Sequence, residues 1–331
     1  MIPILIVSFL CLAAVARGET QATSPISFRG SCDASAAVAL NEDLVAVADD
    51  EDNSIRVYSR HLGGSPIWSR ELSKFLKVGP KSPEADLEGA ARIEDRIYWI
   101  SSHGRNAKGK ARPSRGQFFA TRITATNGTI HLEPMGQPYQ RLLADLLREP
   151  QLARFDLRKA SQLPPKSRGA LNIEGLAATT NGQLLIGFRN PIPNGKALLV
   201  PLQNPSELLE LKPARFGEPI LLNLQGLGIR SITWNEERFL IVAGRFDEGG
   251  KSQLFEWEGD AQPPRRIETM NFRGLNPEAI TCFANTQGPP ELFVTSDDGT
   301  VEFGGKPCKD LKDPDQKCFR ALSLTLSGVP R

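Results

Sequence analysis

The chain has 331 residues, of which 40% are hydrophobic and 24% are charged, a composition typical of globular proteins. Forty basic residues stand against 38 acidic ones, giving a formal net charge of +2. This balance, in a sequence without an aromatic and basic stripe, excludes a general electrostatic attraction to nucleic acid.

The first residues differ from the rest of the chain. Residues 2–16 form an apolar run that ends in Ala14-Val15-Ala16. An apolar run that closes on small residues is typical of a secretory signal peptide, and this one is shorter than the roughly 20 residues of a membrane-spanning helix. We therefore predict a signal peptide over residues 1–18, with an uncleaved anchor as the alternative, export to the periplasm or the medium, and no integral membrane segment after cleavage.

Five later segments share one pattern: a polar residue, a short apolar stretch, a turn, and a second apolar strand with a polar end. They begin, in chain order, at Asp33, Asp86, Asn172, Gly228 and Asn276. All but the widest spacing suit one four-stranded propeller blade of about 40–50 residues. The sequence therefore predicts an all-β fold, a single β-propeller domain over residues 25–331. It has five blades, or six if the widest spacing holds a degenerate one.

The remaining strands of each blade follow the same units. The first four units continue with two apolar stretches each, at residues 54–60 and 66–72, 117–123 and 129–134, 197–202 and 218–224, and 252–259 and 265–272. The fifth has one further stretch, at 321–326. Residues 25–30 precede the first unit and supply the missing strand, so that the last blade closes the ring and exposes fewer strand edges.

Residues 136–170 interrupt the pattern between the second and third units. Helical spacing (YQRLLADLLREP) is followed by a stretch with proline and basic residues, SQLPPKSRG. We interpret this segment as a helical insertion between blades two and three. Its basic residues are Arg141, Arg148, Arg154, Arg158, Lys159, Lys166 and Arg168.

The chain has five cysteines, and Cys11 lies in the predicted signal peptide. An even number of remaining cysteines in an exported protein predicts disulfides. Cys308 and Cys318 bracket a polar loop and form the predicted pair. Cys32 then pairs with Cys282 by elimination, unless Cys282 is a buried apolar residue.

Charged residues recur at the third position of the five units, which reads Ser35, Glu88, Glu174, Arg230 and Glu278. The first strand of each propeller blade lines the central channel, so these side chains are expected to form a ring at one mouth. The antiparallel second strands end on the same face and add His103, Arg105, Arg189 and Arg245. Three glutamates in a narrow channel need a cation such as Ca²⁺, neighbouring arginines, or raised pKa values.

The ring glutamates also have a structural interpretation. Each one can hydrogen-bond the backbone of the next blade, while the glycine that follows Glu88 and Glu174 lets blades pack closely. The pairs at 49–50 and 297–298, which end two second strands, are interpreted as solvated aspartates in turns.

Several motifs resemble known families. The segments ADLEGAARIEDRIYWISSHGRN, NIEGLA, GIRSITW and NPEAIT resemble the bacterial domain of unknown function 3616 over residues 30–328. The Glu-Gly strand openings are distantly similar to the esterase-like phytases, another set of exported propellers. That similarity implies Ca²⁺-assisted attack of water on a phosphate ester. The implied ion ligands are Glu88, Glu174 and Glu278, and the implied anion-binding residues are Arg105, Arg189 and Arg230. Ser35 and Arg230 replace acidic residues of such a site, which argues against catalysis more than against binding.

Three functions are compatible with these patterns. The first is binding of an anionic ligand or a divalent cation at the glutamate and arginine ring. The second is a metal-assisted hydrolase with His103 or Glu174 as general base. The third is a scaffold for a protein partner, with apolar patches on the sides of the blades. The sequence has no Cys-x-x-Cys pair, His-Glu-x-x-His or glycine-rich nucleotide loop, which disfavours zinc and nucleotide chemistry by those routes.

Overall fold

The computed structural model describes residues 21–22, 24–247, 249–259, 262–268, 270–284 and 289–325. The predicted signal peptide and Cys11 lie outside these residues. Strands dominate the described part of the chain, and its α-helices have at most five residues. None of these helices has the length and apolar character that crossing a membrane would require.

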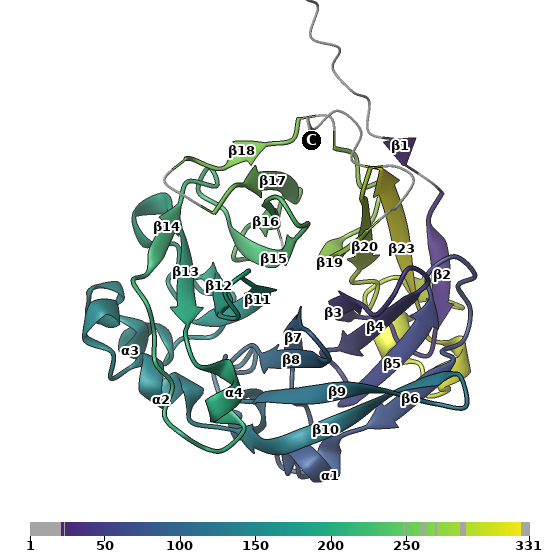
Figure 1. The fold of residues 1–331 in the computed structure, drawn as a ribbon, viewed down its shortest axis with the longest axis horizontal. Helices are drawn as coiled ribbons and strands as arrows, with labels where there is room; N and C mark the ends of the chain where they lie inside the picture. Colours follow the sequence, from purple (N-terminus) through teal and green to yellow (C-terminus); the bar gives the residue numbers. More distant parts are fainter. Residues whose placement is uncertain are drawn as a thin grey trace, which may run out of the picture.

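Four blades follow one another around a central axis, each an antiparallel sheet of four strands (Figure 1). Blade 1 contains β3 (Ala34–Ala39), β4 (Leu44–Asp49), β5 (Ser54–Ser59) and β6 (Trp68–Glu71). Blade 2 contains β7 (Leu87–Ile93), β8 (Arg96–Ser101), β9 (Phe118–Thr126) and β10 (Thr129–Tyr139). Blade 3 contains β11 (Asn172–Ala178), β12 (Leu184–Asn190), β13 (Ala197–Leu202) and β14 (Ile220–Leu222). Blade 4 contains β15 (Gly228–Trp234), β16 (Phe239–Gly244), β17 (Gln253–Trp257) and β18 (Arg265–Arg266).

The fifth blade joins the two ends of the chain. It contains β19 (Pro277–Phe283), β20 (Glu291–Ser296) and β23 (Cys318–Thr325), and β2 (Ile26–Arg29) pairs antiparallel with β23. The short strand β1 (Gln21–Ala22) pairs with the other end of β23. The five-bladed propeller and its closure by an N-terminal strand are therefore confirmed, and no sixth sheet of this kind occurs among the described residues.

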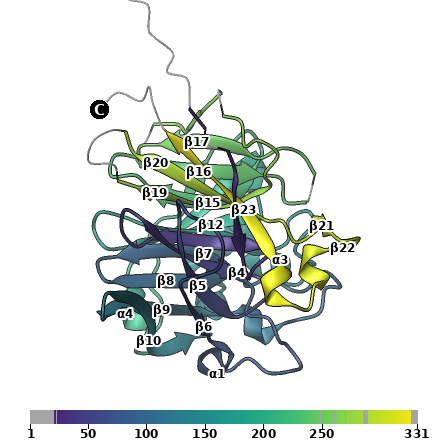
Figure 2. The ribbon, with the colours of Figure 1, turned by 90° about the vertical axis from the view of Figure 1, so that its right-hand side faces the viewer.

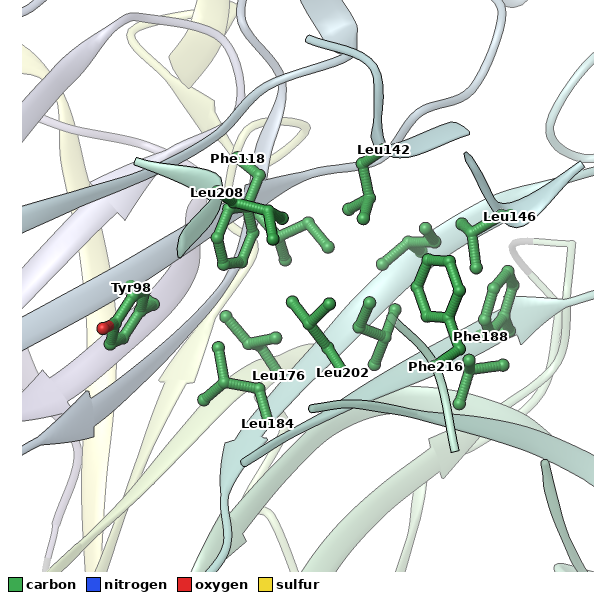
Figure 3. Packing of buried hydrophobic residues seen from close by; sticks show 14 of the residues in the cluster. Tyr98, Phe118, Leu142, Leu146, Leu176, Leu184, Phe188, Leu202, Leu208 and Phe216 are labelled. Carbon is green, nitrogen blue, oxygen red and sulfur yellow. The ribbon is translucent and has the colours of Figure 1, made fainter. Parts of the chain in front are cut away.

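The helical insertion packs on the outer part of blades 2 and 3. It contains α2 (Leu142–Leu146), the 3₁₀ turns η2 (Pro150–Phe155), and α3 (Leu157–Ala160). Leu146 is buried beside Phe188 and Phe216 (Figure 3), and burying such a side chain contributes about 1.5–3 kcal/mol. The insertion begins later than the predicted residue 136 because β10 continues past a β-bulge and pairs Tyr139 with Phe118.

The Glu-Gly openings of two first strands bring neighbouring blades close together. A Cβ atom added to Gly175 would lie 2.8 Å from Ile229 Cγ2 on blade 4, and one added to Gly89 would lie 3.1 Å from Leu176 Cβ on blade 3. The first distance is shorter than real Cβ contacts and the second is tighter than most of them, so both glycines allow the close packing between blades that was predicted.

The disulfide prediction is wrong. Cys308 pairs with Cys32, across 276 residues of sequence, and the thiols of Cys282 and Cys318 are free. The reason is the path of the loop between β20 and β23. The hairpin of β21 (Glu302–Phe303) and β22 (Lys306–Pro307) projects from one side of the ring (Figure 2) and returns the chain toward blade 1. There the Asp298 amide donates to the carbonyl of Cys32, which places Cys308 beside Cys32.

Candidate functional site

A β-bulge shapes the first strand of every blade. The pairing register between first and second strands shifts at the ring position each time, next to Ser35, Glu88, Glu174, Arg230 and Glu278. A bulged residue has no cross-strand partner, and the local bend re-aims its side chain. The five side chains that the sequence placed on one ring are all at least nine-tenths buried, and each follows the same backbone irregularity.

A polar cavity of about 280 Å³ lies at this ring. Its wall includes the ring residues of blades 2 to 5 and the ends of several second strands. Eight acidic residues face five basic ones: Asp50, Glu51, Asp86, Glu88, Glu174, Asp247, Glu278 and Asp297, against Arg115, Lys166, Arg189, Arg230 and Arg245. The cavity therefore has a formal excess of three negative charges before any proton or ion is bound.

Arginines neutralise two of the three ring glutamates. The Arg189 guanidinium donates to Glu174 Oε1 at 2.6 Å, and Arg230 forms an ion pair and a hydrogen bond with Glu278. Burial and the nearby charge of Arg189 lower the pKa of Arg230 to about 10, which keeps it charged at neutral pH. Glu174 Oε2 lies 3.9 Å from Arg230 Nε and accepts no hydrogen bond from the described residues, although Glu174 is 2% exposed.

Glu88 has no such partner. No described residue donates a hydrogen bond to its carboxylate or forms an ion pair with it. Burial, followed by repulsion from Glu174 and Asp86, raises the pKa of Glu88 well above its ordinary value. Asp50 is similar: its Oδ1 is buried without a hydrogen-bond partner, and burial together with Asp49 raises its pKa well above the usual range.

Asp86 completes a cluster with these two residues. One carboxylate oxygen from each of Asp50, Asp86 and Glu88 lies within 4.8 Å of the others, and the same is true of Glu88, Glu174 and Glu278. Arg115 Nη1 lies 2.9 Å from Asp86 Oδ1. Burial still raises the pKa of Asp86, partly offset by Arg115. Glu88 belongs to both groups, so the carboxylates form one continuous acidic surface inside the cavity.

The aspartate pairs are not solvated turns, which corrects the sequence interpretation. Asp49 is buried and accepts hydrogen bonds from Ser31 Oγ at 2.6 Å and from the Cys32 amide at 3.2 Å. Asp298 is buried and binds the Arg320 guanidinium. Both carboxylates are needed inside because they hold the backbone where the fifth blade meets the first.

Two carboxyl groups, those of Asp33 and Asp297, lie next to each other where the fifth blade meets the first. Asp33 hydrogen-bonds Asp297, and burial raises the pKa of Asp33 to about 9, whereas that hydrogen bond helps to lower the pKa of Asp297. The Gly299 amide donates to Asp33 Oδ1 at 2.7 Å and to Asp297 Oδ1 at 3.1 Å. The two carboxyls share one proton near neutral pH, so only Asp297 contributes a charge to the cavity.

Two predicted site residues do not line the cavity. His103 is buried, with Nδ1 2.8 Å from the Ser101 carbonyl, and burial lowers its pKa to about 4. Arg105 instead donates to the backbone carbonyls of Ser161 and Gly109, and so holds a loop of the insertion. Arg245 lines the cavity mouth and pairs with Asp247 at 2.6 Å.

Some lining residues were not expected from the sequence. Arg115 lies on the connection between β8 and β9, outside the repeated pattern, and Asp86 precedes β7 with a positive φ of 58°. Asp86 does stand at the first position of its unit, as Asp33 does in blade 1. That recurrence is the sequence signal that could have found Asp86, whereas Arg115 has no such signal.

Residues 124–299 match the family described as Protein of unknown function (DUF3616). The chain belongs to this family. The match covers more than half of the chain and confirms the resemblance drawn from its motifs, whereas the distant similarity to phytases stays a prediction. No curated protein matches the sequence of this family member.

Solved structures with a similar arrangement are distant from this DUF3616 protein. A glutaminyl cyclase from Myxococcus xanthus has a TM-score of 0.47 at 10% identity, covering 92% of this chain and 96% of that one. A PQQ-bound aldose sugar dehydrogenase from Streptomyces coelicolor has a TM-score of 0.45 at 11% identity, with 94% and 98% covered. A GH43_1 enzyme from Xanthomonas citri has a TM-score of 0.47 at 11% identity, with 92% and 94% covered. These similarities carry no conclusion about ligand or reaction.

Proposed function

We propose that this DUF3616 propeller is an exported binding protein whose central cavity holds a divalent cation at Asp50, Asp86 and Glu88. An anionic ligand then approaches from the mouth, where Arg245 and Lys166 lie. The observation that carries the proposal is that no described residue forms an ion pair or donates a hydrogen bond to the buried Glu88 carboxylate.

Charge explains why a cation is expected there. Glu174 and Glu278 have arginine partners, so the uncompensated negative charge falls on the side of the cavity where Asp50 and Glu88 lie. Without an ion, these two carboxyls must keep protons, as their raised pKa values indicate. A divalent cation would replace these protons and coordinate the carboxylates. Its positive charge would offset the repulsion between the buried negative charges.

The geometry supports a hard ion. Ca²⁺ takes six to eight oxygen ligands at about 2.3–2.6 Å, so two oxygens on one ion are at most about 5 Å apart. The 4.8 Å limit that the three carboxylate oxygens satisfy is compatible with one shared ion. The buried, unbonded Oε2 of Glu174 offers a further acceptor beside the second group. The remaining ligands would come from water or from an oxygen of the anionic ligand.

Export is supported by two features. The apolar run at residues 2–16 is typical of a signal peptide, and the Cys32–Cys308 disulfide is the kind of bond that persists in oxidising compartments. The other hypotheses have less support. His103 does not line the cavity, so the hydrolase lacks one of its two proposed bases. The large apolar side chains exposed in the described part are Leu62 and Ile67 between β5 and β6, Leu211 between β13 and β14, and Phe303 in β21, and this small set gives little support to the scaffold hypothesis.

Calorimetric titration of the purified chain with CaCl₂ and MgCl₂ tests the cation site. Saturation at one hundred times the dissociation constant would raise the free energy of unfolding by about 2.7 kcal/mol. We expect Asp50→Asn and Glu88→Gln each to weaken binding by more than about tenfold, because each removes a charged ligand. Asp95→Asn is the matched control, since Asp95 is exposed and pairs with Arg122 on blade 2. Equal affinity in all variants, or no binding to the wild type, would overturn the proposal.

A further inference from the structure

A second and larger hollow lies beside the cavity, between the helical insertion and blade 3. Its volume is about 820 Å³, within the range of pockets that bury a small or elongated ligand. We call it the insertion groove, and define it by Arg154, Phe155, Lys159 and Arg168 of the insertion and by Pro191 and Phe246 of blades 3 and 4. Three of these residues are basic and two are aromatic, while Asp156 is the acidic residue in its wall.

The groove and the central cavity share one wall. Arg189 and Lys166 line the cavity, whereas Asn190 and Arg168 line the groove. In the same way, Arg245 lines the cavity and the next residue, Phe246, lines the groove. Asn190 fixes this wall, because its side-chain amide donates to the carbonyls of Pro165 and Ser167 in the insertion. Neighbouring residues of the same segments thus line the groove and the cavity, so a ligand in the groove can extend to the cavity mouth.

We propose that the insertion groove binds an acidic oligosaccharide, a chain of uronate-type sugars whose end unit reaches the central cavity. Exposed arginines and a lysine at the rim match carboxylates spaced along such a chain, and guanidinium groups bind carboxylates in a bidentate manner. The partly exposed rings of Phe246 and Phe155 give apolar surface for the C–H faces of sugar rings, and the Arg154 guanidinium lies over the Phe155 ring, 5.0 Å from its centroid. Only the contact of the end unit with the cation rests on the proposed function.

An acidic peptide fits the groove less well. Peptides in extended grooves usually add a strand to an exposed sheet edge. The sheet edge that reaches this groove is β14, which has three residues, of which Leu221 lies in the groove wall. A sugar chain needs no strand edge, so charge and apolar rings suffice to hold it.

The test is calorimetric titration of the purified chain, in EDTA and then in CaCl₂, with tetragalacturonate. Maltotetraose supplies the rings without the charge, and tetraglutamate supplies the charge without the rings. We expect tetragalacturonate to bind in both buffers and the other two to bind at least tenfold more weakly. Arg154→Gln with Lys159→Gln should weaken tetragalacturonate binding about tenfold through two exposed ion pairs. Phe246→Ala should weaken it without a change in charge. Arg122→Gln with Lys306→Gln, both exposed and distant in sequence from the groove, is the matched control.

The outcomes separate the two proposals. Binding of tetragalacturonate in EDTA that the groove variants weaken, and that Asp50→Asn leaves intact, supports the groove whether or not Ca²⁺ binds. Absence of tetragalacturonate binding to a wild-type chain that does bind Ca²⁺ overturns the groove and leaves the cation site standing. Equal binding of tetraglutamate would show that the site recognises charge alone, and would also overturn the sugar proposal.

Discussion

Replacing the disulfide by Cys32→Ser with Cys308→Ser should lower the free energy of unfolding substantially. The bond joins residues separated by 276 positions and ties the start of blade 1 to the loop before the last strand of blade 5. Loop-closure entropy for a segment of this length corresponds to about 5–6 kcal/mol at 25 °C, and removal of native disulfides typically costs about 2–5 kcal/mol. We therefore expect a loss of about 3–5 kcal/mol, a large share of the 5–15 kcal/mol that stabilises an ordinary domain.

Urea denaturation followed by tryptophan fluorescence measures this loss, with the midpoint and slope recorded for each variant. Cys318→Ser and Cys282→Ser are the matched controls, because both thiols are free. Each control removes a sulfur without opening a disulfide, so we expect a change below about 1 kcal/mol. Non-reducing peptide mapping of the wild type checks the linkage directly.

A different ranking of the cysteine variants would place the disulfide elsewhere. If Cys318→Ser destabilised the protein as much as Cys308→Ser while Cys32→Ser had little effect, the bond would link Cys308 to Cys318. The loop closed by such a bond would span about ten residues, and its loss would cost only about 2–3 kcal/mol.

Three other changes have defined outcomes. Gly175→Ala should destabilise the protein by about 1–3 kcal/mol in thermal unfolding, because the new Cβ would collide with blade 4, whereas Gly79→Ala, with open space around it, should not. In cation-free buffer the unfolding free energy of the wild type should fall as pH rises from about 5 to 8, by up to about 1.4 kcal/mol per pH unit for each carboxyl. Because the pKa values of Asp50 and Glu88 are raised, the folded protein keeps their protons after the unfolded chain has lost them. Asp50→Asn with Glu88→Gln should therefore reduce the pH dependence of the unfolding free energy, measured by chemical denaturation. His103 should remain neutral above about pH 5 in an NMR titration, because its pKa is about 4, and His103→Gln should leave Ca²⁺ affinity unchanged; titration near 6.5 would contradict its burial.

Much of the fold could be predicted because the blades repeat. Five units repeat the same pattern of apolar and polar residues, which predicts five sheets. The fifth unit lacks a fourth strand, which predicts residues 25–30 as the closing strand, and β2 confirms this prediction. Element boundaries were less certain. β10 continues beyond residue 136 through a bulge, and a bulge leaves no signal in the pattern of apolar residues.

The site could be predicted in part for the same reason. Aligning the repeats brings Glu88, Glu174, Arg230 and Glu278 to one ring, and the structure places all four on the cavity wall. The partners of these residues could not be predicted. Arg115 comes from a connection outside the repeat, and the fate of His103 depends on how far its ring is buried.

Asp50 and Glu88 depart from the usual behaviour of carboxylates in folded proteins, and this departure is the strongest argument for a functional site. Sequence rules expect carboxylates to be solvated or paired, and the other ring glutamates follow this expectation by binding Arg189 and Arg230. The same cavity thus gives two glutamates arginine partners, whereas no described residue forms an ion pair or a hydrogen bond with the Glu88 carboxylate, and the nearby charge of Arg189 offsets its burial only in part. A stable fold gains nothing from two buried, unpaired carboxyls, since desolvation opposes their charge. Such local conflicts with the rules of folding occur mainly at functional sites, which is why we place the ligand there.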